Sequence, residues 1–146
     1  MQGARYPFVM AGPRTRYTQC GDVELAYQVF GDGPIDLLLY SGSSIPIECM
    51  DEEPSMARFQ RRLASFARVI RFDKRGMGMS DRGSPSNPPV LDDWVNDGVA
   101  VLDAVGSERA VVLAPWIDAP AGLALAATHP ERVSRLIVVN GAARLS

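Results

Sequence analysis

At 146 residues the chain is long enough for one domain with its own hydrophobic core, and its 47% apolar and 22% charged residues are ordinary for a globular protein. A net charge of −2 gives no electrostatic basis for binding nucleic acid or an anionic membrane. No apolar run reaches the roughly 18 residues of a transmembrane helix, and the N-terminus lacks a signal-peptide pattern, so we expect a cytoplasmic protein without nucleic-acid or membrane partners.

The cysteine and histidine residues of the sequence do not form a pattern that predicts a metal or redox site. Cys20 and Cys49 lie in no CxxC pair, and for a protein expected in the cytoplasm we predict two free thiols rather than a disulfide. His129 is the only histidine, which excludes a histidine-rich metal site. We therefore expect no metal and no cofactor.

Along the chain, strand patterns alternate with helical ones. Residues 1–16 are expected to be a loose lead-in to a domain spanning residues 17–146. Apolar runs or apolar–polar alternation predict strands in five segments: residues 23–29, 35–40, 69–72, 109–114 and 136–139. The first segment is typical of a half-buried antiparallel strand, and the second of a strand buried on both faces.

Three helical patterns separate these strands. They cover residues 54–67, 91–105 and 122–129. Apolar residues at helical spacing predict the buried face of the first helix: Met56, Phe59, Leu63 and Phe66. Gly106 is a natural C-terminal cap for the second helix, and Pro130 ends the third. This alternation implies βαβ units and an α/β fold with a mostly parallel sheet and flanking helices.

Three motifs in order resemble the N-terminal half of the α/β-hydrolase fold family. Residues 73–80 (DKRGMGMS) match its D-x-R-G-x-G-x-S turn, and residues 126–133 (AATHPERV) match the A-x-x-x-P-E-R-V end of a helix. Residues 111–122 lie between them, where the family carries its nucleophile. The resemblance implies a truncated α/β-hydrolase fold.

Three further segments of the sequence are similar to one bacterial subgroup of this family. Residues 27–34, 61–66 and 102–108 resemble hydrolase-like domains of actinobacteria, which often precede a class III adenylyl cyclase or a transcriptional regulator. The resemblance implies an association with such a regulatory system. It does not carry cyclase activity to this chain, whose sequence contains no cyclase segment.

The family's nucleophile turn, G-x-S-x-G, aligns with residues 114–118 (APWID). Trp116 therefore stands at the apex, and an indole cannot attack a carbonyl. Asp118 replaces a glycine that normally permits close packing of strand and helix. Because a bulky side chain fits a strained apex poorly, we expect the elbow to relax into a plainer turn, with Pro115 setting its φ.

Asp118 is the one weak candidate nucleophile, since dehalogenases of this fold use an aspartate. It lies two positions late, in a first helical turn, where a carboxylate is well explained as a partner of the positive helix end. The resemblance also implies an oxyanion loop, whose backbone N–H groups would be those of Ser43 and Ile117. The side chains expected to line the pocket are Ser41, Gly42 and Trp116.

A general base is not within reach of this elbow. His129 follows Trp116 mostly along a helix, which puts it about 20 Å away at roughly 1.5 Å per residue, whereas a base must come within about 3 Å. We expect His129 to be a residue of the helix C-terminus. For Asp73 and Arg75 we expect turn hydrogen bonds and a structural ion pair rather than ligand contacts.

The family's catalytic acid and histidine would come from strands beyond residue 139, and without those strands residues 136–139 form an exposed apolar edge. That edge would pair in a homo-oligomer or with a separate C-terminal half, unless the chain is a marginally stable gene fragment.

We expect a degenerate, truncated and non-catalytic domain, a pseudoenzyme that is ligand-binding, regulatory or a remnant. The alternative is an ester or acyl hydrolase, active only with a complementing chain or through Asp118. A third hypothesis is an interaction protein whose Trp116-lined pocket binds an apolar small molecule.

Overall fold

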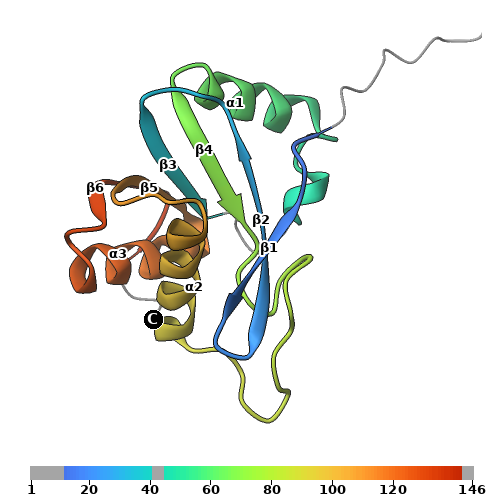
Figure 1. Cartoon of the computed structure of the whole chain (residues 1–146), viewed down its shortest axis with the longest axis vertical. Coiled ribbons are helices and arrows are strands. Elements are labelled where there is room, and N and C mark those ends of the chain that lie inside the picture. Colours follow the sequence, from blue (N-terminus) through green and yellow to red (C-terminus); the bar gives the residue numbers. More distant parts are fainter. Residues whose placement is uncertain (1–11, 41–44, 143–146) are drawn as a thin grey trace, which may run out of the picture.

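The computed structural model describes residues 12–40 and 45–142 as a six-stranded sheet flanked by helices (Figure 1). The strands are β1 (Arg16–Cys20), β2 (Val23–Phe30), β3 (Ile35–Tyr40), β4 (Ala67–Phe72), β5 (Ala110–Pro115) and β6 (Val133–Val139). The helices are α1 (Pro54–Ala64), α2 (Leu91–Ala104) and α3 (Ala119–Thr128), with the short 3₁₀ turns η1 (Ile47–Cys49) and η2 (Trp116–Asp118). All the predicted strands and helices are present.

The strand order is β1-β2-β4-β3-β5-β6. The pairs β4–β3, β3–β5 and β5–β6 are parallel, whereas β1–β2 and β2–β4 are antiparallel. This confirms the predicted α/β fold with a mostly parallel sheet. The sequence did not predict β1, because its residues are largely exposed and contain no apolar run, so pairing with β2 is what defines it.

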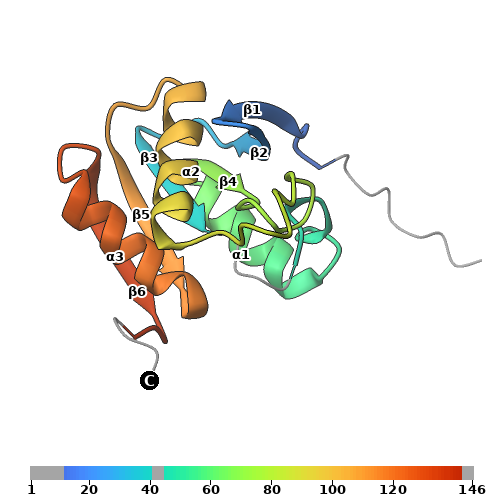
Figure 2. The same ribbon diagram turned by 90° about the horizontal axis from the view of Figure 1, so that it is seen from below.

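Helices cover both faces of the sheet (Figure 2). On one face, α2 and α3 pack against each other and enclose the larger core, which includes Leu38, Ile70 and Leu125. On the other face, α1 covers a smaller core around Leu37, Leu63 and Val69. β3 therefore contributes to both cores, as expected for a strand buried on both faces.

The buried face of α1 differs from the predicted one. Phe59 and Phe66 are 44% and 48% exposed, and the helix instead buries Ala57, Gln60 and Leu63. The amide of Gln60 lies against the sulfur atoms of two buried or half-buried methionines, which gives this polar side chain contacts in the core. Apolar spacing fixed the period of the helix but not its rotation, and Phe66 lies beyond its end at Ala64.

Parallel pairing brings the carboxyl ends of the strands to one edge of the sheet. Tyr40 at the end of β3 pairs with Phe72 at the end of β4, and Pro115 at the end of β5 pairs with Val139. The residues that follow β4 and β5 therefore lie along the same edge, with the end of β3 between them. In open α/β sheets this is the edge where ligands bind.

Close packing of α3 on the sheet depends on Gly122. A Cβ at this position would lie 2.5 Å from the Cβ of Ala114 and 3.2 Å from Cδ1 of Leu136. Ala114 cannot retreat easily, because it is fully buried and its Cβ is attached directly to the backbone of β5, which is paired on both sides.

Gly122→Ala should lower the free energy of unfolding by about 1–3 kcal/mol, since overpacking outweighs the gain of about 1 kcal/mol in helix propensity. Urea denaturation measures the difference. The control is Ala127→Gly at an exposed position of α3, where only the propensity changes. An increase in stability for Gly122→Ala would contradict the close approach.

Candidate functional site

The predicted strand–turn–helix elbow is present, and it is strained. β5 ends at Pro115 and leads through η2 directly into α3. Trp116 at the apex has a φ of +50°, in the left-handed region that residues with a Cβ rarely adopt. The expected relaxation into a plainer turn is therefore wrong. The bulk of the indole is accommodated because 59% of the residue is exposed, so the ring does not have to fit inside the turn.

The apex presents an apolar surface. Ile117 is 48% exposed beside Trp116, and Val139, paired with Pro115 on the neighbouring strand, is also exposed. An indole offers an aromatic face and one N–H donor, but no group that can form a covalent acyl intermediate. These residues can contact an apolar ligand, and none of the three is a nucleophile.

The predicted oxyanion loop lies outside the described residues. This applies to Ser41, Gly42 and Ser43, whose roles in the pocket and the oxyanion hole stay predictions. Ile117, the other predicted donor, lies in η2 immediately after the apex.

Asp118 ends η2 and is the N-cap residue of α3, but its side chain makes no capping hydrogen bond. Its carboxylate instead forms an ion pair with the ammonium group of Lys74, and the two side chains are 0% and 2% exposed. The position at the helix start was predicted, whereas the partner was not. Lys74 occupies a variable position of the D-x-R-G-x-G-x-S turn, so no residue pattern predicts this role for it.

Aromatic residues enclose this ion pair. The ammonium nitrogen of Lys74 lies 4.5 Å from the ring centroid of Trp94 in α2, within range of a cation–π interaction. The hydroxyl of Tyr40 donates a hydrogen bond of 3.1 Å to the backbone carbonyl of Trp94. Burial raises the pKa of Tyr40, and the nearby carboxylate of Asp118 raises it further. The Lys74–Asp118 ion pair is thus buried beside the aromatic side chains of Trp94 and Tyr40.

The turn at residues 73–80 is held by hydrogen bonds, as predicted for Asp73. Its carboxylate accepts from the backbone N–H groups of Ile47 and Met79 at 3.2 and 2.9 Å, and its carbonyl accepts from the hydroxyl of Ser80. Burial raises the pKa of Asp73, while the two N–H donors act in the opposite direction. These contacts tie η1 to the end of β4.

Arg75 forms the structural ion pair expected of it. Its guanidinium contacts the buried carboxylate of Asp97 at 2.7 Å and that of Asp93 at 3.1 Å. A third contact of 3.2 Å reaches the sulfur of Cys20, which with Cys49 is a free thiol, as predicted. Burial and the neighbouring Asp97 raise the pKa of Cys20, so the surroundings of this side chain favour the neutral thiol.

His129 lies at the C-terminus of α3, as predicted. It is the C-cap residue, and a ring nitrogen lies 2.9 Å from the hydroxyl of Thr128, one residue earlier. This contact is local to the helix end.

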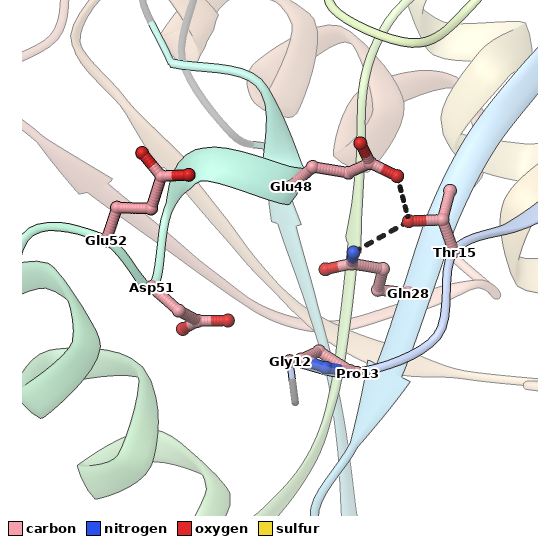
Figure 3. Close-up of a pocket in the computed structure, with 7 residues that line it drawn as sticks. All are labelled: Gly12, Pro13, Thr15, Gln28, Glu48, Asp51 and Glu52. Carbon is pink, nitrogen blue, oxygen red and sulfur yellow. Dashed lines mark hydrogen bonds between the residues drawn. The ribbon is translucent and has the colours of Figure 1, made fainter. Parts of the chain in front are cut away.

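A cavity of about 570 Å³ lies elsewhere, between the start of β1, β2 and the turn after η1 (Figure 3). Its lining residues are Gly12, Pro13, Thr15, Gln28, Glu48, Asp51 and Glu52. Two of its carboxylates already have partners: Glu48 accepts from the hydroxyl of Thr15 at 3.0 Å, and Asp51 pairs with the buried Arg71 at 2.7 Å. None of the elbow residues lines this cavity.

Within residues 12–40 and 45–142, no group of three or more His, Cys, Asp or Glu side chains is arranged to hold a metal ion. In the same part of the chain, no helix has the length and apolarity needed to cross a membrane.

Comparison with known proteins finds hydrolases, although no family model matches the chain. The "Putative carbamate hydrolase RutD" of Azorhizobium caulinodans is 36% identical over 129 residues, which are 88% of this chain and 45% of that protein. The protein of the same name from Caulobacter segnis is 45% identical over 76 residues, 52% of this chain and 28% of its own length. Among solved structures, the enol-lactonase from Burkholderia xenovorans LB400 is 28% identical with a TM-score of 0.74, covering 90% of this chain and 48% of the enzyme. The chain thus spans less than half the length of these relatives.

The left-handed apex can be tested by comparing Trp116→Gly with Trp116→Ala. A Cβ in this conformation is disfavoured by about 1–2 kcal/mol, so the glycine variant should be the more stable by about 1 kcal/mol in urea denaturation. In ordinary backbone the order is reversed, because glycine loses more conformational entropy on folding. The same two substitutions at Ile117, whose φ is not positive, provide the control and should show the usual order. An alanine variant at position 116 as stable as the glycine variant would contradict the strained apex.

Proposed function

Because its sequence relatives and its fold support an α/β-hydrolase family, we propose that this chain is the N-terminal portion of a hydrolase-like domain that does not by itself catalyse the family's nucleophilic chemistry. The observation that carries the proposal is Trp116 at the apex of a preserved elbow. Acyl transfer in this fold needs a nucleophile at that apex, a general base in hydrogen-bond contact with it, and an acid that orients the base. Trp116 supplies no nucleophile, and His129 is engaged at the far end of α3.

The alternative function is an ester or acyl hydrolase that is complete only with a further chain segment, or that uses Asp118. It is supported by relatives whose names denote hydrolases. Asp118 is fully buried and paired with Lys74, so attack on a substrate would require this ion pair to open. Breaking a buried pair is destabilising by about 3–5 kcal/mol, which makes Asp118 the weaker route.

We also propose a binding role for β6, the outermost strand on one side of the described sheet. In β6, Ile137, Val138 and Val139 are 44%, 37% and 43% exposed, and β6 lies at the edge of the described sheet. Such an edge favours pairing with a complementary C-terminal half or with a second copy of the chain. The regulatory setting beside an actinobacterial adenylyl cyclase and the cytoplasmic location, both expected from the sequence, are proposals of the same kind.

Ester hydrolysis tests the catalytic proposal. With purified protein, p-nitrophenyl acetate and butyrate should be hydrolysed no faster than in buffer, because Trp116 at the apex is not a nucleophile and His129 is engaged at the far end of α3. Asp118→Ala should leave this background unchanged, and so should Asp103→Ala, an exposed carboxylate on α2 used as the control. Turnover above background that Asp118→Ala abolishes while its circular dichroism spectrum stays that of the unchanged chain, and that Asp103→Ala preserves, would establish the route through Asp118.

Fluorescence tests the binding of an apolar ligand at Trp116. In a Trp94→Phe background, Trp116 is the remaining tryptophan, and titration with fatty acids and their methyl esters should shift its emission to shorter wavelength as the exposed indole is covered. The control is the double variant with Trp116→Phe, which reports any non-specific signal. An unchanged emission across the whole series would remove the apolar-ligand proposal.

A further inference from the structure

The ion pair between Lys74 and Asp118, here called the elbow ion pair, joins two strands that are not neighbours. Lys74 follows β4 and Asp118 follows β5, and β3 lies between these strands in the sheet. The pair therefore spans the carboxyl end of β3 and ties the turn after β4 to the elbow. Both side chains are almost fully buried.

Two buried charges persist only where each compensates the other. Removing an ion from water is unfavourable by several kcal/mol, and a close partner with further polar contacts is needed to offset this. Here the partner is present, and the face of Trp94 adds a favourable electrostatic contact to the ammonium group. Movement of Asp118 away from Lys74 would break this buried ion pair, so the pair restrains the position of Asp118.

The strained apex lies between two fixed points. On one side, Pro115 is held in the sheet by its pairing with β6. On the other side, Asp118 is fixed by Lys74, and only Ile117 separates it from Trp116. A residue with positive φ is unfavourable by about 1–3 kcal/mol and persists where its surroundings determine it from both sides.

We propose that Lys74 and Asp118 are positioning residues that hold Trp116 in its left-handed conformation and so present its indole at the carboxyl edge of the sheet. One member of the elbow ion pair, Asp118, stands where the family's elbow has a glycine, and the pair stabilises the turn through its buried charges. This inference deepens the proposed function, since it concerns the same elbow. It does not depend on the outcome of the ester assay, because it concerns backbone conformation and not turnover.

The preference for glycine over alanine at position 116 is a direct measure of that conformation. In the otherwise unchanged chain, Trp116→Gly should have a folding equilibrium constant about fivefold larger than Trp116→Ala. In the background Lys74→Met/Asp118→Leu, which removes both charges and keeps apolar volume, the elbow is free to relax, and this advantage should disappear or reverse. Replacement of both members of a buried pair is often neutral for stability, so this background is expected to fold.

The matched control is the background Arg75→Met/Asp97→Leu. It removes another buried ion pair that also joins the turn after β4 to a helix, but one that does not touch the elbow. There the fivefold advantage should remain. A second test background, Lys74→Gln/Asp118→Asn, removes both charges, keeps polar groups at both positions and is used if the first does not fold, whereas Lys74→Arg, which keeps the charge, should retain the advantage. A glycine advantage that survives loss of the elbow ion pair, or that is lost equally in the control, would overturn the proposal.

Discussion

The parallel pairing of β3 with both β4 and β5 is the constraint on which the candidate site depends. It aligns the ends of three strands that are far apart in sequence and places their following residues along one edge. Lys74 reaches Asp118 only because a single strand separates β4 from β5. The same alignment places Tyr40 at the end of the intervening strand, and α2 brings Trp94 over the ammonium group of Lys74, where the hydroxyl of Tyr40 donates a hydrogen bond to the Trp94 carbonyl. The strand order of the sheet, and not a local sequence motif, therefore brings the residues of the site together.

The close approach of strand and helix at the elbow depends on other glycines than the one in the G-x-S-x-G pattern. With an aspartate at position 118, the small residues that allow strand and helix to approach are Gly122 and Gly141. A Cβ on Gly141 would lie 2.2 Å from the Cβ of Ala119 and 3.3 Å from the carbonyl oxygen of Trp116. Substitution of one glycine is thus accommodated because two others carry the contact. The turn has a left-handed apex with a tryptophan at that position.

Sequence patterns were sufficient for the fold but only partly for the site. Apolar runs such as residues 35–40 predicted strands, because a strand buried on both faces requires apolar side chains on both. Gly106 predicted the end of α2, and its positive φ in the structure is that of a helix C-terminal cap. The rotation of α1 could not be predicted, since Gln60 is buried partly through a contact with Met50, which lies before the helix. The strain at Trp116 was missed for a related reason: local bulk argued for relaxation, whereas the outward direction of the indole depends on the whole edge. Lys74 has no signature of its own, because its role exists only opposite Asp118.

The two roles considered for Asp118 exclude each other on energetic grounds. As a nucleophile it would need an exposed carboxylate with free lone pairs facing a substrate, within reach of a group that completes the reaction. As an anchor it needs the opposite: burial, a fixed geometry and a cation that compensates its charge. The carboxylate is fully buried and paired with a buried lysine, which satisfies the second set of conditions and none of the first. On the proposal that Asp118 anchors the elbow, its carboxylate acts on the backbone of the turn, and the exposed Trp116 two residues before it is the part of the elbow that a ligand can meet.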